Sequence, residues 1–225
     1  MHVKTTEKPS NTQRAIQALR DMIFTGELAA GSNHLESELA LRLEMSRTPV
    51  REAALTLESQ GLLELIPRKG VRILPVSPDD MAEIYDVLTE LESLSACNAA
   101  SFQYDAEDLQ TLASAIDEME SAVSSNDLER WAKADDEFHR ELVRLGRNSR
   151  VSAIFELMND QVRRARAVTL YVRPVPHRSN EDHKKVFQAI QSGDAELASQ
   201  THRAHRQKAK EMMLDLLRKH RFKAV

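Results

Sequence analysis

Helical periodicity is the feature that most restricts the fold of this chain. From Ser77 to about residue 219, apolar residues recur every three or four positions almost without interruption. The clearest stripe is Leu109, Leu112, Ile116 and Met119, a spacing that places them on one face of a helix. With only 6 Gly and 7 Pro in 225 residues, an all-β or loop-rich protein is disfavoured. The sequence therefore predicts a mainly α-helical protein.

A domain boundary is expected at Ser77. Serine is a favoured N-cap, Pro78 suits the first helical position, and Asp79 and Asp80 complement the positive end of a helix. Two domains are expected because 225 residues exceed the usual domain size of roughly 100–150. We predict a disordered arm over 1–11, a first domain over 12–76 and an all-α bundle over 77–220, with later helices at about 127–146, 149–170, 179–192 and 195–219.

The first domain has the pattern of a winged helix-turn-helix. Apolar spacing predicts one helix from Thr12 to the Thr25-Gly26 stop, a short second helix over 36–43, and a third that starts after Ser46 and ends at Gly61. The segments 62–67 and 71–75 then favour two strands joined at Arg68-Lys69-Gly70, because glycine tolerates a positive φ.

Two arginines begin the third helix. Arg47 and Arg51 are one turn apart and project from the same face, beside N–H groups that attract phosphate. In a recognition helix such residues reach base edges, and arginine pairs bidentately with guanine. Arg68, Lys69 and Arg72 on the ribbon are expected to hold the DNA backbone.

Net charge alone would argue against a nucleic-acid-binding protein, since the chain carries a net charge of −4. The charge is unevenly divided, however. Residues 1–75 hold 10 basic and 9 acidic residues, a net +1, so the acidity belongs to the later part of the chain.

The segments LESELA (35–40), SRTPVREA (46–53) and PRKG (67–70) resemble the DNA-binding domain of GntR-type bacterial regulators, over about residues 12–75. The resemblance implies that Arg47 and Arg51 read or clamp operator DNA, that Ser46 and Thr48 touch phosphate, and that the Gly70 wing tip enters the minor groove. A departure is Glu44, where the family usually has glycine in the turn. The predicted DNA-binding set is Ser37, Ser46, Arg47, Thr48, Arg51, Arg68, Lys69, Gly70 and Arg72.

Ionisable residues also fall on the apolar faces of the second domain. Asp135 and His139 complete the stripe of one helix, His183 shares a face with Phe187, and His205 lies in line with apolar residues of the last helix. Buried without partners these groups would be costly, so they must pair with each other, bind a metal or bind a ligand. Carboxylate and imidazole suit Zn²⁺, Ni²⁺, Fe²⁺ or Mn²⁺. The sequence pattern predicts that His177 lies in a loop. It also predicts that His202, one turn before His205, lies beside these four residues.

The pattern DxxFH (135–139), GxN (146–148), His183 and the later Gly193-Asp194 resembles the FCD ligand-binding domain of the FadR subfamily, over about 78–219. The resemblance implies a metal site of Asp135, His139, His183 and His205, holding Zn²⁺ or Ni²⁺ and open to an effector carboxylate. Many members have an arginine where this chain has Leu88, and that arginine often helps to hold an acidic effector. Its absence either argues against a simple dicarboxylate or shifts recognition of the acid to Arg163 or Arg166. Either could instead be a solvated surface residue. The candidate effector-binding residues are Arg163, Arg166 and His202.

These observations predict a homodimeric transcriptional regulator, most often a repressor in this family, that binds a two-fold symmetric operator and an organic-acid effector. One alternative is a regulator for which the metal is itself the signal. A remote one is a metal-dependent hydrolase, disfavoured because no general base is evident. The single Cys97 and the lack of an apolar run of roughly 18–20 residues favour a reduced, cytoplasmic protein that does not meet a membrane.

Overall fold

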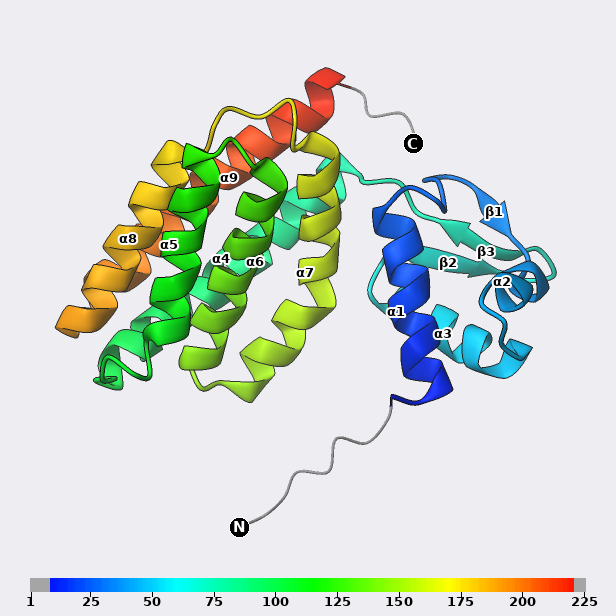
Figure 1. Ribbon diagram of the computed structural model, residues 1–225, viewed down its shortest axis with the longest axis horizontal. Helices are drawn as coiled ribbons and strands as arrows, with labels where there is room; N and C mark the ends of the chain where they lie inside the picture. The colour runs from blue at the N-terminus through cyan, green and yellow to red at the C-terminus, as the bar shows by residue number, and fades with distance from the viewer. Residues whose placement is uncertain (1–8, 221–225) are drawn as a thin grey trace, which may run out of the picture. The chain divides into compact units, whose positions relative to one another are not determined.

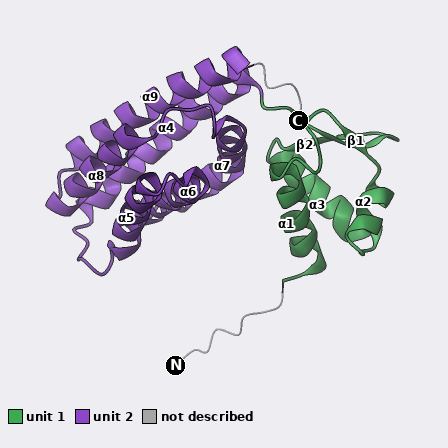
Figure 2. Ribbon diagram, turned by 45° about the horizontal axis from the view of Figure 1, so that its top comes forward, with its two compact units in different colours: residues 1–76, 223–225 green, residues 77–222 purple. Residues whose placement is uncertain are grey.

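The computed structural model describes residues 9–220, which separate at Val76/Ser77 into two compact units (Figures 1 and 2). Residues 1–8 of the predicted arm lie outside the described residues. The rest of that arm is ordered into a helix start. The Ser10 side chain accepts from the Gln13 N–H and the Gln13 side chain accepts from the Ser10 N–H, which forms a capping box.

The first unit is a winged helix-turn-helix, as predicted. Its elements are α1 (Asn11–Phe24), β1 (Asn33–His34), α2 (Glu36–Arg42), α3 (Arg47–Ser59), β2 (Leu63–Ile66) and β3 (Gly70–Ile73). The apolar faces of the helices and the ribbon enclose one core, in which Leu19, Val50, Leu57 and Ile73 are completely buried. The apolar spacing of the first and third helices therefore located their core faces correctly.

The sheet has a third strand that the sequence pattern did not indicate. Its order is β1-β3-β2, with both pairs antiparallel, so the short strand β1 covers the outer edge of β3. A polar two-residue strand has no periodicity that could reveal it. The wing is anchored to the helix-turn-helix through this strand.

Gly70 directly follows the turn of the wing, where it pairs with Ile66. Its φ is +91°, and a Cβ atom there would lie 2.2 Å from the carbonyl oxygen of His34. The turn itself consists of Pro67, Arg68 and Lys69, and Arg68 adopts a left-handed φ of 65°. Gly70 therefore adjoins the wing turn and lies against β1, and its contact with the minor groove stays a prediction.

The turn between α2 and α3 keeps the conformation that glycine would favour. Glu44 occupies it with a φ of 52°, in the left-handed region that most side chains avoid. The departure at Glu44 thus leaves the helix-turn-helix intact.

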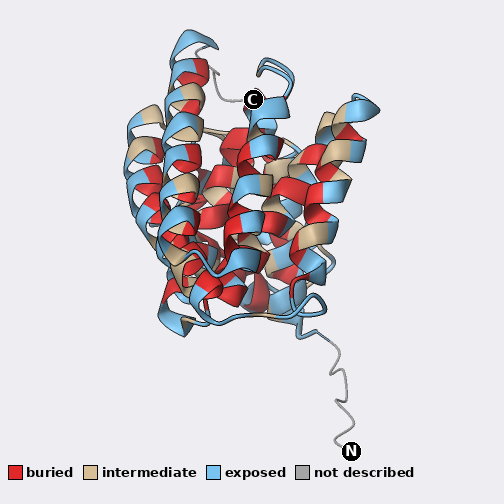
Figure 3. Cartoon of the chain, turned by 90° about the vertical axis from the view of Figure 1, so that its left-hand side faces the viewer, coloured by how far each residue is buried: buried red, intermediate tan, exposed pale blue. Residues whose placement is uncertain are grey.

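The second unit is a bundle of helices: α4 (Pro78–Ser101), α5 (Gln110–Ser124), α6 (Leu128–Leu145), α7 (Ser149–Thr169), α8 (His177–Ser192) and α9 (Ala195–His220). The Ser77 side chain caps α4 by accepting from the Asp80 N–H. The long helices α4 and α9 lie side by side, and α6 and α8 approach them (Figures 1 and 2). Figure 3 shows the buried residues gathered on the inward faces of these helices.

Two expectations for the bundle need correction. Apolar spacing predicts that Ile154, Leu157 and Val162 face inward, but Ile154 and Leu157 are each 39% exposed, whereas Phe155 and Val162 are buried. Polar residues, among them Asn159 and Arg166, occupy the buried face of α7, so its apolar spacing was misleading. His177, expected in a loop, is the first residue of α8 and is exposed.

Gly146, at the end of α6, allows close contact with α4. A Cβ atom there would lie 2.8 Å from both Cα and Cβ of Ser95. We expect Gly146→Ala to lower the free energy of unfolding by roughly 1–3 kcal/mol, because the two backbones must separate. Chemical denaturation measures this, with Ser114→Ala on the exposed face of α5 as the control. Equal stability of the two variants would contradict the close approach.

Candidate DNA-binding surface and candidate metal centre

The N-terminal turn of α3 presents two arginines to solvent. The side chains of Arg47 and Arg51 are 72% and 66% exposed. Each has a guanidinium nitrogen 3.8 Å from a carboxylate oxygen of Glu36, which begins α2 and is itself only 12% exposed. One largely buried carboxylate therefore lies within ion-pair distance of both arginines.

These arginines border a groove of about 400 Å³ between α3 and the wing. Ser37, Arg68 and Gly70 also line it, so the predicted residues of α2, α3 and the wing meet at one surface. Ser46 and Thr48 are exposed at the start of α3, and within the described chain the Ser46 side chain makes no capping bond. Lys69 is exposed in the wing turn, while Arg72 lies on β3 within 3.3 Å of Glu64.

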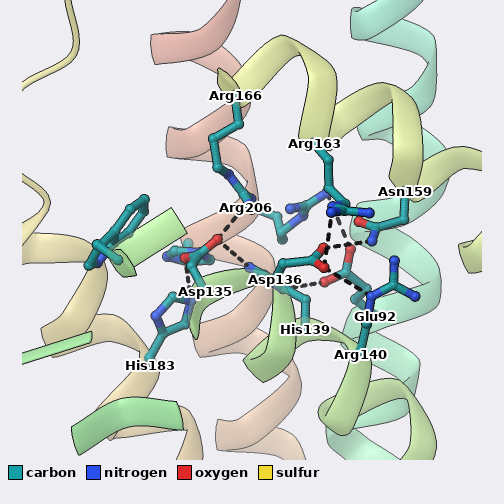
Figure 4. Close-up of polar contacts among 12 residues, drawn as sticks. Glu92, Asp135, Asp136, His139, Arg140, Asn159, Arg163, Arg166, His183 and Arg206 are labelled. Atoms are coloured by element: carbon teal, nitrogen blue, oxygen red, sulfur yellow. Dashed lines mark hydrogen bonds and ion pairs between the residues drawn. The ribbon is translucent and has the colours of Figure 1, made fainter. Parts of the chain in front are cut away.

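The four predicted metal ligands converge inside the second unit. Asp135 and His139 come from α6, His183 from α8 and His205 from α9, and all are buried. One ring nitrogen from each histidine lies within 4.8 Å of the others. Asp135 places one carboxylate oxygen 3.7 Å from His139 Nε2 and the other 3.7 Å from His183 Nε2 (Figure 4).

Several of these atoms are buried without a hydrogen-bond partner in the described chain: His139 Nε2, Asp135 Oδ2 and both ring nitrogens of His183. Asp135 Oδ2 has the Arg166 guanidinium 2.8 Å away, but the three histidine nitrogens lack a partner, and a buried polar atom without one is costly. Two of these nitrogens, His139 Nε2 and His183 Nε2, lie 3.7 Å from oxygens of Asp135. Three imidazoles and one carboxylate form the donor set of a borderline divalent ion. The residues therefore fit a metal ion.

A buried glutamate of α4 hydrogen-bonds two histidines in this region. Glu92 of α4 accepts from His139 Nδ1 at 2.6 Å and from His202 Nε2 at 3.1 Å, and lies 3.2 Å from Arg206. A carboxylate on Nδ1 leaves Nε2 as the coordinating atom, as in many metal sites. Asp182 stands 3.9 Å from Nδ1 of His205 in a similar position. Our sequence reasoning missed Glu92, although it follows Leu88 by four residues on the buried face of α4.

The charges of the site match those that metal binding requires. Burial, with added repulsion from His205 and His139, holds the pKa of His183 well below its usual value, so this imidazole is neutral. Burial by itself would raise the pKa of Glu92, but Arg206 and His139 outweigh it and hold that pKa well below the usual range. Burial by itself would raise the pKa of Asp135, but Arg166 together with the neighbouring histidines and Arg173 lowers it.

A cavity of about 280 Å³ opens beside the cluster. Asp135, His139 and His205 line it on one side. The remaining lining combines cations with aromatic and apolar side chains: Arg166, Arg173, Arg178, Arg206, Lys208, Tyr85, Trp131, Pro174, Val175, Pro176, Ala209 and Met212, besides Ser179 and Asp182. The cavity therefore connects the predicted ligands to a space that suits a small anion.

Of the three predicted effector-binding residues, only Arg166 lines the cavity. Arg166 lines the cavity, is buried, and its Nη2 lies 2.8 Å from Asp135 Oδ2. A solvated role for Arg166 is thus wrong. Arg163 does not line the cavity and instead lies 3.5 Å from Asp136 and 3.2 Å from Asp160 (Figure 4). His202 does not line it either, because its ring is turned towards Glu92.

The two units together define a DNA-binding protein of the winged helix-turn-helix class with a helical second domain. Residues 11–73 match the family model described as bacterial regulatory proteins, gntR family, and residues 83–208 match the FCD domain. The chain belongs to the GntR family, in the group that carries an FCD domain. It is a transcriptional regulator.

Relatives and solved structures agree with this assignment. The chain is 30% identical over 200 residues to an uncharacterized HTH-type transcriptional regulator of Streptomyces ambofaciens, covering 89% of this chain and 84% of the relative. It is 29% identical to a probable D-xylose utilization operon transcriptional repressor of Paenarthrobacter nicotinovorans, covering 86% of each. The structure of E. coli McbR/YncC shares the fold, with a TM-score of 0.76 at 22% identity over 92% of this chain and 99% of that one. No helix within residues 9–220 is long and apolar enough to cross a membrane.

Proposed function

We propose that this regulator binds a two-fold symmetric operator as a homodimer and represses transcription until a small organic acid binds beside a metal in the FCD domain. The observation that carries the proposal is the cavity in which Asp135, His139 and His205 meet the buried Arg166. Symmetric half-sites require a dimer that presents two recognition helices.

The ion would be held by Asp135, His139, His183 and His205, with Zn²⁺ or Ni²⁺ the best match to these donors. When bound, it would supply a Lewis acid that attracts a carboxylate. Arg166, already ion-paired at Asp135, adds a second positive group for that acid. Closure of the helices around the ligand would bias the dimer towards arrangements that no longer fit the operator.

Metal removal separates this proposal from a regulator for which the metal is the signal. A thermal-shift screen of sugar acids, hydroxy acids and aromatic acids first identifies a ligand that stabilises the protein. Fluorescence anisotropy then measures binding to DNA from upstream of the regulator's own gene. We expect the acid to weaken DNA binding by about tenfold or more, corresponding to a coupling of about 1.4 kcal/mol, and only in metal-loaded protein.

Chelation and reloading without acid form the control. If the metal alone changes operator affinity and no acid has an effect, the direct metal sensor is supported instead. If the acid acts equally with and without metal, the proposed role of the ion in ligand binding is wrong.

A further inference from the structure

Arg173, in the connection between α7 and α8, is partly buried and its guanidinium group has no acceptor in the described chain. Its Nε and Nη1 atoms are buried and have no hydrogen-bond partner in the described chain. Its guanidinium carbon lies 4.9 Å from the centre of the Trp131 ring, so its plane is held by an aromatic contact. Both side chains line the cavity beside the metal-ligand cluster.

Three of the other cations that line the cavity have a carboxylate within ion-pair distance, and the fourth, Arg178, is exposed to solvent. Arg166 lies 2.8 Å from Asp135, Arg206 lies 3.2 Å from Glu92, and Lys208 lies 3.3 Å from Asp182. For Arg173, by contrast, no carboxylate lies within ion-pair distance among residues 9–220. Burial and the nearby Arg166 lower the pKa of Arg173, and the attraction of the more distant Asp135 only partly offsets them.

The charge balance of the cavity also points to more than one negative group. Asp135 is shared between Arg166 and two histidines, so it cannot also neutralise Arg173. A divalent ion would add two further positive charges on the same side. A monocarboxylate placed at that ion would leave Arg173 buried and unpaired, whereas a ligand with a second acidic group would supply its missing acceptor.

We infer that Arg173 binds an acidic group of the effector separate from the group at the metal, so that the effector is a small dianionic organic acid. This inference rests on the proposed function and adds the ligand class and the residue that selects it. The apolar wall of Trp131, Pro174 and Met212 accommodates the carbon skeleton between the two acidic ends.

The test compares acids that differ only by a carboxylate in place of a methyl group. The pairs are succinate and butyrate, malate and 2-hydroxybutyrate, and phthalate and 2-methylbenzoate. Thermal shifts are recorded at equal concentrations with metal-loaded wild type, Arg173→Gln and the control Arg150→Gln, which changes an exposed arginine of α7. We expect the dianion of at least one pair to bind about tenfold or more tightly than its partner in wild type and control, and this preference to disappear in Arg173→Gln.

A second readout excludes a merely structural role. Without ligand, Arg173→Gln should be at least as stable as wild type, since it removes a buried uncompensated charge. A lower melting temperature of the ligand-free variant, with its metal content retained, would overturn the assignment of Arg173 to the ligand.

The remaining outcomes are distinguishable. If members of every pair stabilise wild type equally, the dianion inference is wrong and the organic-acid proposal stands. If the dianion preference persists in Arg173→Gln, another residue selects the second acidic group. If no acid shifts the wild-type protein, both the inference and the organic-acid effector are overturned.

Discussion

His183→Ala will reduce the divalent metal that copurifies with the protein from about one ion per chain to a small fraction of that amount. His183 is completely buried, and within the described chain neither ring nitrogen has a hydrogen-bond partner. Its Nε2 faces Asp135 at 3.7 Å, so removal of the imidazole opens one side of the ligand set. Elemental analysis after gel filtration measures the ratio of metal to protein.

The matched control is His177→Ala in the same helix, since His177 is exposed at the start of α8. Because the alanine variant leaves a buried cavity that lowers stability, His183→Gln serves as a second test that retains most of the side-chain volume. Circular dichroism establishes that each variant is folded. A folded His183→Gln protein with its metal content unchanged would show that the histidine cluster is not the metal site.

Arg47→Ala and Arg51→Ala will each weaken specific operator binding by about 1–3 kcal/mol, or roughly 5–150-fold. Both guanidinium groups project into solvent at the start of α3 while Glu36 holds them from one side. Preorganised arginines lose little entropy when they bind a base edge. The double variant should bind specific and random DNA with similar affinity.

Arg14→Ala is the control for this pair, because Arg14 is exposed on α1 and not at the groove. Gel shifts at two or more salt concentrations separate base contacts from phosphate contacts. Loss of a phosphate contact lowers the salt dependence and affects all sequences alike, whereas loss of a base contact lowers the ratio of specific to random binding. Undiminished specific binding by both single variants would refute the recognition role of this helix face.

Much of the candidate site could be predicted from the sequence because the spacing of apolar residues identifies the buried face of each helix. Asp135 and His139 occupy core positions of α6, and His183 and His205 do the same in α8 and α9, so helical spacing alone marks them as inward-facing. The family resemblance then indicated that they act together. What spacing cannot indicate is which inward-facing residues of different helices become neighbours.

The arginines show this limit most clearly. Arg163 and Arg166 lie three residues apart on α7, yet one is held in a half-exposed ion-pair network and the other is buried against Asp135. The rotation of α7 about its axis decides between them, and polar residues on its buried face concealed that rotation. Arg173 lies outside any periodic segment, so its position over Trp131 had no sequence signal.

The sequence by itself determined the helical class, the boundary at Ser77, the recognition helix and the inward faces that carry the histidines, because these depend on local backbone preferences and on burial of one face of a helix. Tertiary structure alone decided the partners of those residues. It brought Glu92 behind His139, joined β1 to the wing and placed an unpaired arginine in the cavity, because such contacts arise only when helices distant in the chain pack together.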